Sequence, residues 1–271
     1  IEPLKAQGDL PQWLATGLQS TAAPAAVAAA AAAGDDGRTS DGHAHATAGA
    51  APDQPHDLPE LLRHPPWQRS KKPSAKDKLD QPWLKLPSRL PSLPVFVASG
   101  RLAPARLRES GQALPPPALE ALLTMFMLSK PGAPYAGMAQ VLPALDRAAL
   151  AAMGRDLHRQ WSEAACPNED RWILLAQAWT ADAGAMQNLI DDIAWWAGMG
   201  AFGRAKFGLS VLADMAAFQG SDGPLKALVR FADKGKPSLR KPALEQVQKA
   251  AERMGMTPDE LGDRLIPDLG L

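Results

Sequence analysis

Residues 171–198 read RWILLAQAWTADAGAMQNLIDDIAWWAG, and each half of this stretch carries apolar residues at helical spacing. Positions i, i+3, i+4 and i+7 are apolar on both sides of Asp182, a residue type that favours the N-cap of a helix. The stretch therefore predicts two consecutive helices, each with one apolar face that a neighbour must cover. These faces consist of Trp172, Leu175, Ala176 and Trp179, and of Met186, Leu189, Ile190 and Ile193.

The same spacing recurs through residues 118–271, which predicts an all-α domain there. Helix pairs are expected to begin near residues 168, 202 and 238, so the repeat interval is about 34 to 36 residues. Such an interval is typical of a HEAT-like helical-hairpin repeat array, in which stacked neighbours bury a continuous core. A compact irregular helical bundle is the alternative. The further apolar stripes are Leu119, Leu122, Leu123 and Phe126; Leu225, Leu228, Val229 and Ala232; and Ala243, Val247, Ala250, Ala251 and Met254.

Two zones of different composition open the chain. Residues 1–20 carry leucines four residues apart, at Leu10, Leu14 and Leu18, which predicts a short amphipathic helix. Residues 21–57 are rich in alanine and glycine, and 15 alanines fall within residues 21–52. Alanine favours helix but buries little apolar area. We therefore expect this low-complexity, Ala/Gly-rich zone to be a flexible linker.

Residues 58–117 form a basic, proline-rich segment with 12 prolines and with 11 Lys and Arg against 4 Asp and Glu. Proline lacks an amide donor and disfavours helix in the residue before it, so the segment is expected to be extended or turn-like. Residues 95–97 are a candidate short strand within it. We expect Trp67 and Trp83 to anchor the segment across the helical domain, because each can bury a large apolar area.

The overall composition narrows the class of function. The 271 residues include 29 Lys and Arg and 29 Asp and Glu, so the formal net charge is zero. This balance excludes a wholly disordered polyelectrolyte and a globally basic nucleic-acid binder. One cysteine excludes a disulfide framework and a cysteine-based zinc site, and it fits a cytoplasmic protein. No run of about 18 strongly apolar residues occurs, so no membrane interaction is predicted.

Two patterns resemble ligand sites but lack the context that such sites need. Residues 198–203 read GMGAFG, the GxGxxG pattern of dinucleotide binding, yet a helical stripe precedes them where a buried strand is required. We therefore favour a turn between two closely packed helices. Four histidines lie in linker-like sequence without the fixed geometry of a metal site, so neither a metal nor a cofactor is predicted. They are His43, His45, His56 and His64.

No catalytic residue is predicted either. A nucleophilic cysteine needs a base partner, and the nearest histidine to Cys166 in sequence is His158. We favour a structural role for Cys166 and a place on a helix surface for His158. Asp191 and Asp192 would point about 100° apart on a helix. A solvated pair is therefore favoured over an acid–base pair.

The densest basic run of the chain is the candidate interaction surface. Lys226, Arg230 and Lys234 lie four residues apart, opposite a stripe of leucine and valine, which places three cations on one exposed helix face. Such a face could bind phosphate groups. A solubilising helix face is the favoured interpretation. The run continues through Lys236, Arg240 and Lys241.

Five stretches, taken in order, resemble a known bacterial family. They are residues 61–67 with the basic residues 71–73, residues 119–125, 134–137 and 146–150, and the terminal motif LGDRLIPDLGL at 261–271. Together they resemble the central region of the large MolR-like proteins, named after a molybdate metabolism regulator, whose members often carry a WGR domain and end in a domain of unknown function. The resemblance implies a HEAT-like region inside a longer chain. It supplies no catalytic residue, and this sequence has no Trp-Gly-Arg triplet.

We therefore expect a non-catalytic helical-repeat scaffold, or protein-interaction segment, of a larger cytoplasmic protein. Its partners would be another protein or the flanking domains of the parent chain. One alternative is a regulatory segment that associates with nucleic acid through its basic surface. A second alternative is a structural part of an enzyme whose active site lies outside this fragment.

Overall fold

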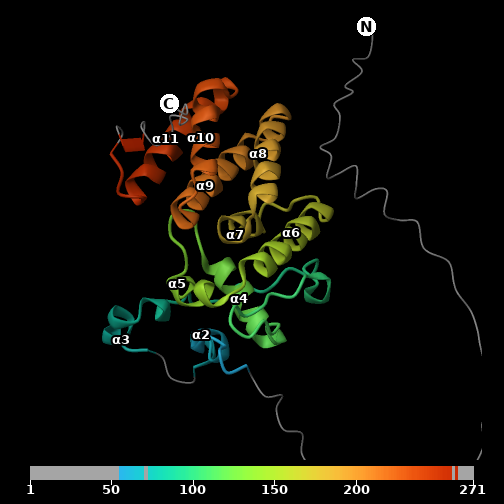
Figure 1. The fold of residues 1–271 in the computed structure, drawn as a ribbon, viewed down its shortest axis with the longest axis vertical. Helices are drawn as coiled ribbons and strands as arrows, with labels where there is room; N and C mark the ends of the chain where they lie inside the picture. The colour runs from blue at the N-terminus through green and yellow to red at the C-terminus, as the bar shows by residue number, and fades with distance from the viewer. Residues whose placement is uncertain (1–54, 70–72, 258–259, 262–271) are drawn as a thin grey trace, which may run out of the picture. The chain divides into compact units, whose positions relative to one another are not determined.

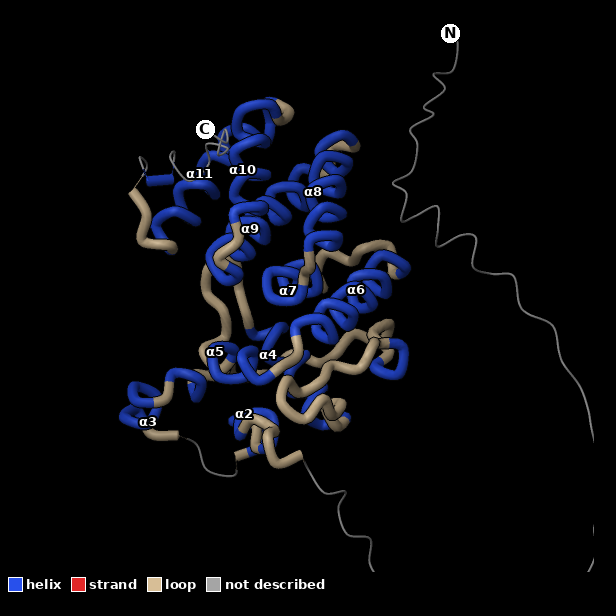
Figure 2. The backbone as a smooth tube through the Cα atoms, in the orientation of Figure 1, coloured by secondary structure: helices blue, strands red, loops and turns tan. Residues whose placement is uncertain are grey.

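Helices are the regular elements in the part of the chain that the computed structural model describes, namely residues 55–69, 73–257 and 260–261 (Figure 2). Within these ranges the only β-type pairing consists of isolated bridges, so the all-α prediction is confirmed. The predicted helix in residues 1–20, residues 21–54 of the predicted linker and the terminal motif beyond Leu261 lie outside the described residues.

Seven helices of nine residues or more make up the described helical body. They are α4 (Pro116–Leu128), α6 (Arg147–Glu163), α7 (Trp172–Thr180), α8 (Ala183–Gly198), α9 (Phe202–Gln219), α10 (Asp222–Lys234) and α11 (Pro237–Arg253). Shorter elements connect or precede them: α2 (Glu60–Arg63), η1 (Pro66–Gln68), α3 (Ala75–Asp80), η2 (Pro82–Leu84), η3 (Ser99–Arg101), α5 (Met138–Val141) and η4 (Leu142–Ala144).

The long helices after α5 pack as consecutive pairs: α6 on α7, α8 on α9, and α10 on α11. The second helices of these pairs also pack on one another, α7 on α9 and α9 on α11 (Figure 1). The pairs begin at Arg147, Ala183 and Asp222, so successive starts are 36 and 39 residues apart. Helix α9 contacts α7, α8, α10 and α11 and is therefore the central helix of this part.

The pairing differs from the sequence-based prediction by one helix. The spacing suggested that residues 172–180 and 183–198 form a pair, whereas the extensive packing of α8 is on α9. Every internal helix of a stack has a neighbour before it and a neighbour after it. The spacing of apolar residues therefore indicates roughly how far apart the helix pairs begin. It does not show whether a helix pairs with the helix before it or with the helix after it.

Polar caps and small residues fix where these helices meet. Asp182 is an N-cap, as predicted, and Asp146 is another; their Oδ1 atoms accept hydrogen bonds from the N–H groups of Ala185 and Ala149 at 2.9 and 2.8 Å. Gly154 faces Thr180, and a Cβ added to this glycine would lie 2.3 Å from the Thr180 hydroxyl oxygen. This position needs glycine for α6 to approach the end of α7.

A buried ion pair joins α9 to α11. The Asp214 carboxylate is fully buried, contacts Arg253 and accepts the Gly132 N–H on both oxygens at 3.0 Å. Burial raises the pKa of the Asp214 carboxyl group, and the Gly132 and Arg253 donors only partly oppose that change. One carboxylate thus ties α9, α11 and the loop after α4 together.

The proline-rich segment runs through loops and short helical turns against the helical body. Its short helices α2 and α3 were not predicted, and each lies between two prolines. The candidate strand at residues 95–97 is wrong, because these residues form a turn that exposes Val95 and buries Val97. The segment also ends before residue 117, since Pro116 is the first residue of α4 and proline is tolerated in a first helical turn.

Candidate functional site

A groove of about 560 Å³ lies between α8 and α10, and basic side chains line it. The Lys226, Arg230 and Lys234 side chains come from α10, and Lys236 follows in the turn to α11. Asp191 is the acidic residue in this lining, so cations outnumber carboxylates four to one. Four of the six cations singled out in the sequence therefore meet in one concave surface.

The amphipathic pattern of α10 explains why these cations face solvent. Leu225, Leu228 and Phe231 are buried against the neighbouring helices. Lys226, Arg230 and Lys234 lie on the opposite face and are exposed, as the spacing predicted. No described residue forms an ion pair with these three side chains, and their charges are available to a ligand.

The remaining two cations of the run point to other places. Arg240 Nε donates a hydrogen bond to the Gly235 carbonyl oxygen at 2.9 Å, where α10 ends. Lys241 lines a different depression beside Lys206 and Glu245. The six residues are therefore not one continuous surface, because the turn at Gly235 separates the α10 cations from those on α11.

Apolar side chains of α8 complete the groove. Met186 and Ile190 are half-buried and line it, although their spacing had assigned them to the core stripe. Asp191 is exposed and accepts a hydrogen bond from Gln187 Nε2 at 2.9 Å. The sequence placed these two side chains on the broad apolar face of α8. Only the position of α10 in the structure shows that this part of the face stays accessible.

Trp67 and Trp83 pack on the helical body, and neither belongs to the basic groove. Both are half-buried against the hydrophobic core. The Tyr135 hydroxyl donates a hydrogen bond to the Trp83 carbonyl oxygen at 2.5 Å, and the Trp67 ring lies 6.3 Å from the Tyr135 ring. Burial raises the pKa of Tyr135 to about 12, so this donor keeps its proton. These contacts are the anchoring expected for the two tryptophans.

The GxGxxG pattern at residues 198–203 forms the turn between α8 and α9. Gly200 has φ +78°, a conformation that glycine adopts without strain. Helix α8 precedes the turn, where a dinucleotide site requires a buried strand. Gly203 has no atom within 4 Å of an added Cβ, so its absent side chain serves no close packing. The expected turn between two closely packed helices is confirmed, because α8 packs on α9.

His158 and Asp192 are buried together, contrary to the sequence-based expectations for both. His158 was expected on a helix surface and Asp192 in solvent, but Asp192 is fully buried with Oδ2 3.9 Å from His158 Nε2. Burial lowers the pKa of His158 to about 4, so the imidazole is neutral at neutral pH. Asp191 alone of the two aspartates is exposed, because successive helical residues face different sides of α8.

Cys166 has the environment of a structural cysteine. It is half-buried with φ +54°, and its carbonyl oxygen accepts a hydrogen bond from Arg204 Nη2 at 2.9 Å. Burial raises the pKa of its thiol, and the nearby Arg204 charge opposes this only in part. A raised pKa disfavours the thiolate that nucleophilic chemistry uses.

The described residues also bear on metals and membranes. No group of three or more His, Cys, Asp or Glu side chains in residues 55–69, 73–257 and 260–261 is arranged to hold a metal ion. His56 and His64 fall within these ranges, and His43 and His45 lie outside them. No helix in the described part is both long and apolar enough to cross a bilayer.

Comparisons with known proteins place the chain beside one curated relative of unassigned function. Over 208 residues it is 32% identical to "Uncharacterized protein YehI" from Escherichia coli (strain K12). This match covers 76% of the present chain but only 17% of that protein's length. No protein-family model matches the chain, and no solved structure matches it.

Proposed function

We propose that this chain is a non-catalytic helical scaffold within a larger cytoplasmic protein of MolR-like type, and that its α8–α10 groove binds an acidic helical segment of a protein. The stacked pairs α6/α7, α8/α9 and α10/α11 support a HEAT-like repeat. The small share of the curated relative that the chain spans supports a parent with further domains.

One observation carries the choice of partner: the groove combines four cations with an apolar wall. An amphipathic helix could place its apolar side on Met186 and Ile190 while its acidic side chains meet Lys226 and Arg230. A phosphate backbone would use the cations but would leave the apolar wall uncovered. The chemistry of the groove therefore favours an acidic protein helix over nucleic acid.

The test uses the full 271-residue chain and a labelled amphipathic peptide with glutamate on one face and leucine on the other. We expect binding by fluorescence anisotropy at low salt. The double variant Lys226→Glu, Arg230→Glu should weaken it about tenfold or more, since like charges then face each other. The matched control Lys206→Glu, Lys241→Glu reverses two charges outside the groove and should leave the affinity unchanged.

Two results would contradict the proposal. A peptide of equal charge with its leucines replaced by serine should bind more weakly, and equal binding would remove the role of the apolar wall. Tighter binding of duplex DNA, with a steep loss of affinity as salt rises, would favour the nucleic-acid alternative.

A further inference from the structure

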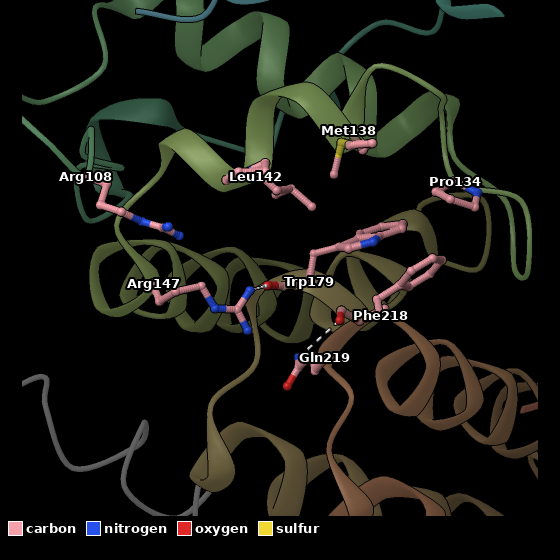
Figure 3. Close-up of a pocket in the computed structure, with 11 residues that line it drawn as sticks. Arg108, Pro134, Met138, Leu142, Arg147, Trp179, Phe218 and Gln219 are labelled. Carbon is pink, nitrogen blue, oxygen red and sulfur yellow. Dashed lines mark hydrogen bonds between the residues drawn. The ribbon is translucent and has the colours of Figure 1, made fainter. Parts of the chain in front are cut away.

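A second pocket, of about 430 Å³, lies where α5, η4, α6, α7 and the end of α9 meet (Figure 3). This volume is within the range typical of small-molecule sites. Met138 and Leu142 line it on one side, and Trp179 and Phe218 line it on another. The α8–α10 groove contributes no residue to it.

Among the residues that the structure describes, the ionisable ones lining this pocket are Arg108 and Arg147, and none is a carboxylate. Figure 3 shows both guanidinium groups reaching into the same end of the pocket. Two arginines without a nearby acid repel each other, and an anion between them would remove that repulsion. The planar guanidinium group also matches carboxylate and phosphate oxygens in geometry.

Both arginines are held in place and still have donors to offer. The Arg108 backbone N–H donates to the Ala144 carbonyl oxygen at 2.8 Å, which fixes this residue beside η4. Arg147 Nη1 donates to the Trp179 carbonyl oxygen at 2.9 Å. A guanidinium group has five N–H donors, so each arginine retains donors that can bind a ligand.

The other end of the pocket is aromatic. The Trp179 ring is stacked on Phe126 with centroids 5.8 Å apart, and Phe218 lies 5.5 Å from it. Phe218 is 40% exposed, so part of its ring is accessible beside the pocket. Gln219 is oriented by hydrogen bonds from Nε2 to the Ala178 and Ala181 carbonyl oxygens, at 3.1 and 3.2 Å.

We propose that this pocket binds a small organic oxyanion, in which a carboxylate or phosphate group is attached to an apolar ring system. Arg108 and Arg147 would bind the charged group, and Phe218 with the edge of Trp179 would cover the ring. This inference is independent of the proposed scaffold function, because the two sites use different residues. Sequence reasoning missed it, since Arg108 and Trp179 lie 71 positions apart and no local pattern links them.

The experiment is isothermal titration of the full chain with three probes that share one ring system: naphthoate, naphthyl phosphate and the neutral naphthalenemethanol. We expect at least one anion to bind, and the neutral alcohol to bind about tenfold more weakly or not at all. Comparison of naphthoate with naphthyl phosphate decides which charged group the arginines prefer.

Variants then locate the binding. Arg108→Gln removes a charge from an exposed side chain and should weaken anion binding about tenfold. Ala139→Trp should block the pocket without changing its charge. The matched control Lys206→Gln removes an equal charge outside both sites and should bind like the unmodified chain. Melting curves of each variant confirm that the fold is retained.

Three outcomes would overturn the proposal. These are no binding of either anion, equal binding of the alcohol, or unchanged affinity in both folded variants Arg108→Gln and Ala139→Trp. An equal loss in Lys206→Gln would likewise overturn it, because the effect would then be one of net charge alone.

Discussion

Backbone N–H and C=O groups find their hydrogen-bond partners differently in two regions of the molecule. These regions are the proline-rich segment of residues 55–115 and the helical body of residues 116–257. Helices of the body satisfy their own N–H and C=O groups and bury side chains against one another. Backbone groups of the segment bond mostly within local turns, and a few bond to side chains of the body. Gln160 accepts the Ala98 N–H at 2.7 Å and donates to its carbonyl oxygen at 3.3 Å, and Asp156 accepts the Ala103 N–H at 2.7 Å.

The difference shows how a chain with few helical stretches becomes part of a folded unit. The segment still adds apolar side chains to the shared core, which are Leu58, Leu61, Leu62, Val97, Leu102, Ala105, Leu107 and Leu114. Its contribution to stability is therefore expected to be large even though its regular structure is small. Four measurements test this comparison, in order of expected effect.

Deletion of residues 58–115 should have the largest effect. The body would lose these eight buried apolar side chains, and the faces that they cover on α4 and α6 would meet water. We expect a loss of at least about 5 kcal/mol, or roughly 15 °C in Tm. Thermal unfolding by circular dichroism measures it, with a deletion of similar length within residues 1–53 as the control. An unchanged Tm would show that the body folds without the segment.

Two leucines of equal burial allow a sharper comparison. Leu107 lies in the segment and Leu122 lies in α4, and both are fully buried. Replacement of either by alanine should cost about 3 to 4 kcal/mol, because each leaves a cavity in the same core. Urea unfolding gives both values. A cost near zero for Leu107→Ala alone would mean that the segment is only loosely attached.

Acidification should lower the stability of the helical body through protonation of His158. Burial lowers the pKa of this imidazole to about 4, below the 6.5 of an exposed histidine, so the unfolded chain takes up a proton at higher pH. The neutral, buried imidazole therefore contributes fully to the free energy of unfolding above pH 6.5. This contribution is lost as the pH falls towards 4, and the loss reaches about 3 kcal/mol.

The measurement is urea unfolding from pH 7 to pH 4.5 of the unmodified chain and of His158→Gln. The variant should lose less stability over this range. The control His64→Gln changes an exposed histidine of the segment and should keep the full pH dependence. An identical pH dependence in all three proteins would exclude His158 as the cause.

Loss of the hydrogen bonds that Gln160 of α6 makes to the segment should have the smallest effect on stability. Gln160→Met keeps the side-chain length but leaves the Ala98 N–H and C=O without this partner, at a cost of about 2 kcal/mol. Glu163→Gln is the matched control one turn away on α6, because it weakens the exposed pair with Arg101, which is worth less than about 1 kcal/mol. Equal effects on Tm would contradict a special role for Gln160.

Several features followed from local sequence because local physics determines them. The apolar stripes of α4, α7, α8 and α10 needed only the helical period, and Asp146 and Asp182 needed only the hydrogen-bonding capacity of an N-cap. The exposed cations of α10 followed from its buried leucines. The short helices α2 and α3 were missed because the high average proline content of the segment concealed the short stretches between prolines that can still form a helical turn.

Other features depended on which helices meet. The burial of His158 and Asp192 could not be predicted, because polar residues on a helix become interior only when another helix covers them. The same holds for the groove between α8 and α10 and for the pocket that brings Arg108 to Trp179. Sequence alone thus determined the all-α class, the caps and the amphipathic faces, since these depend on residues within one or two turns. Tertiary structure decided the helix pairing, the buried charges and both concave sites, since these depend on contacts between residues far apart in the chain.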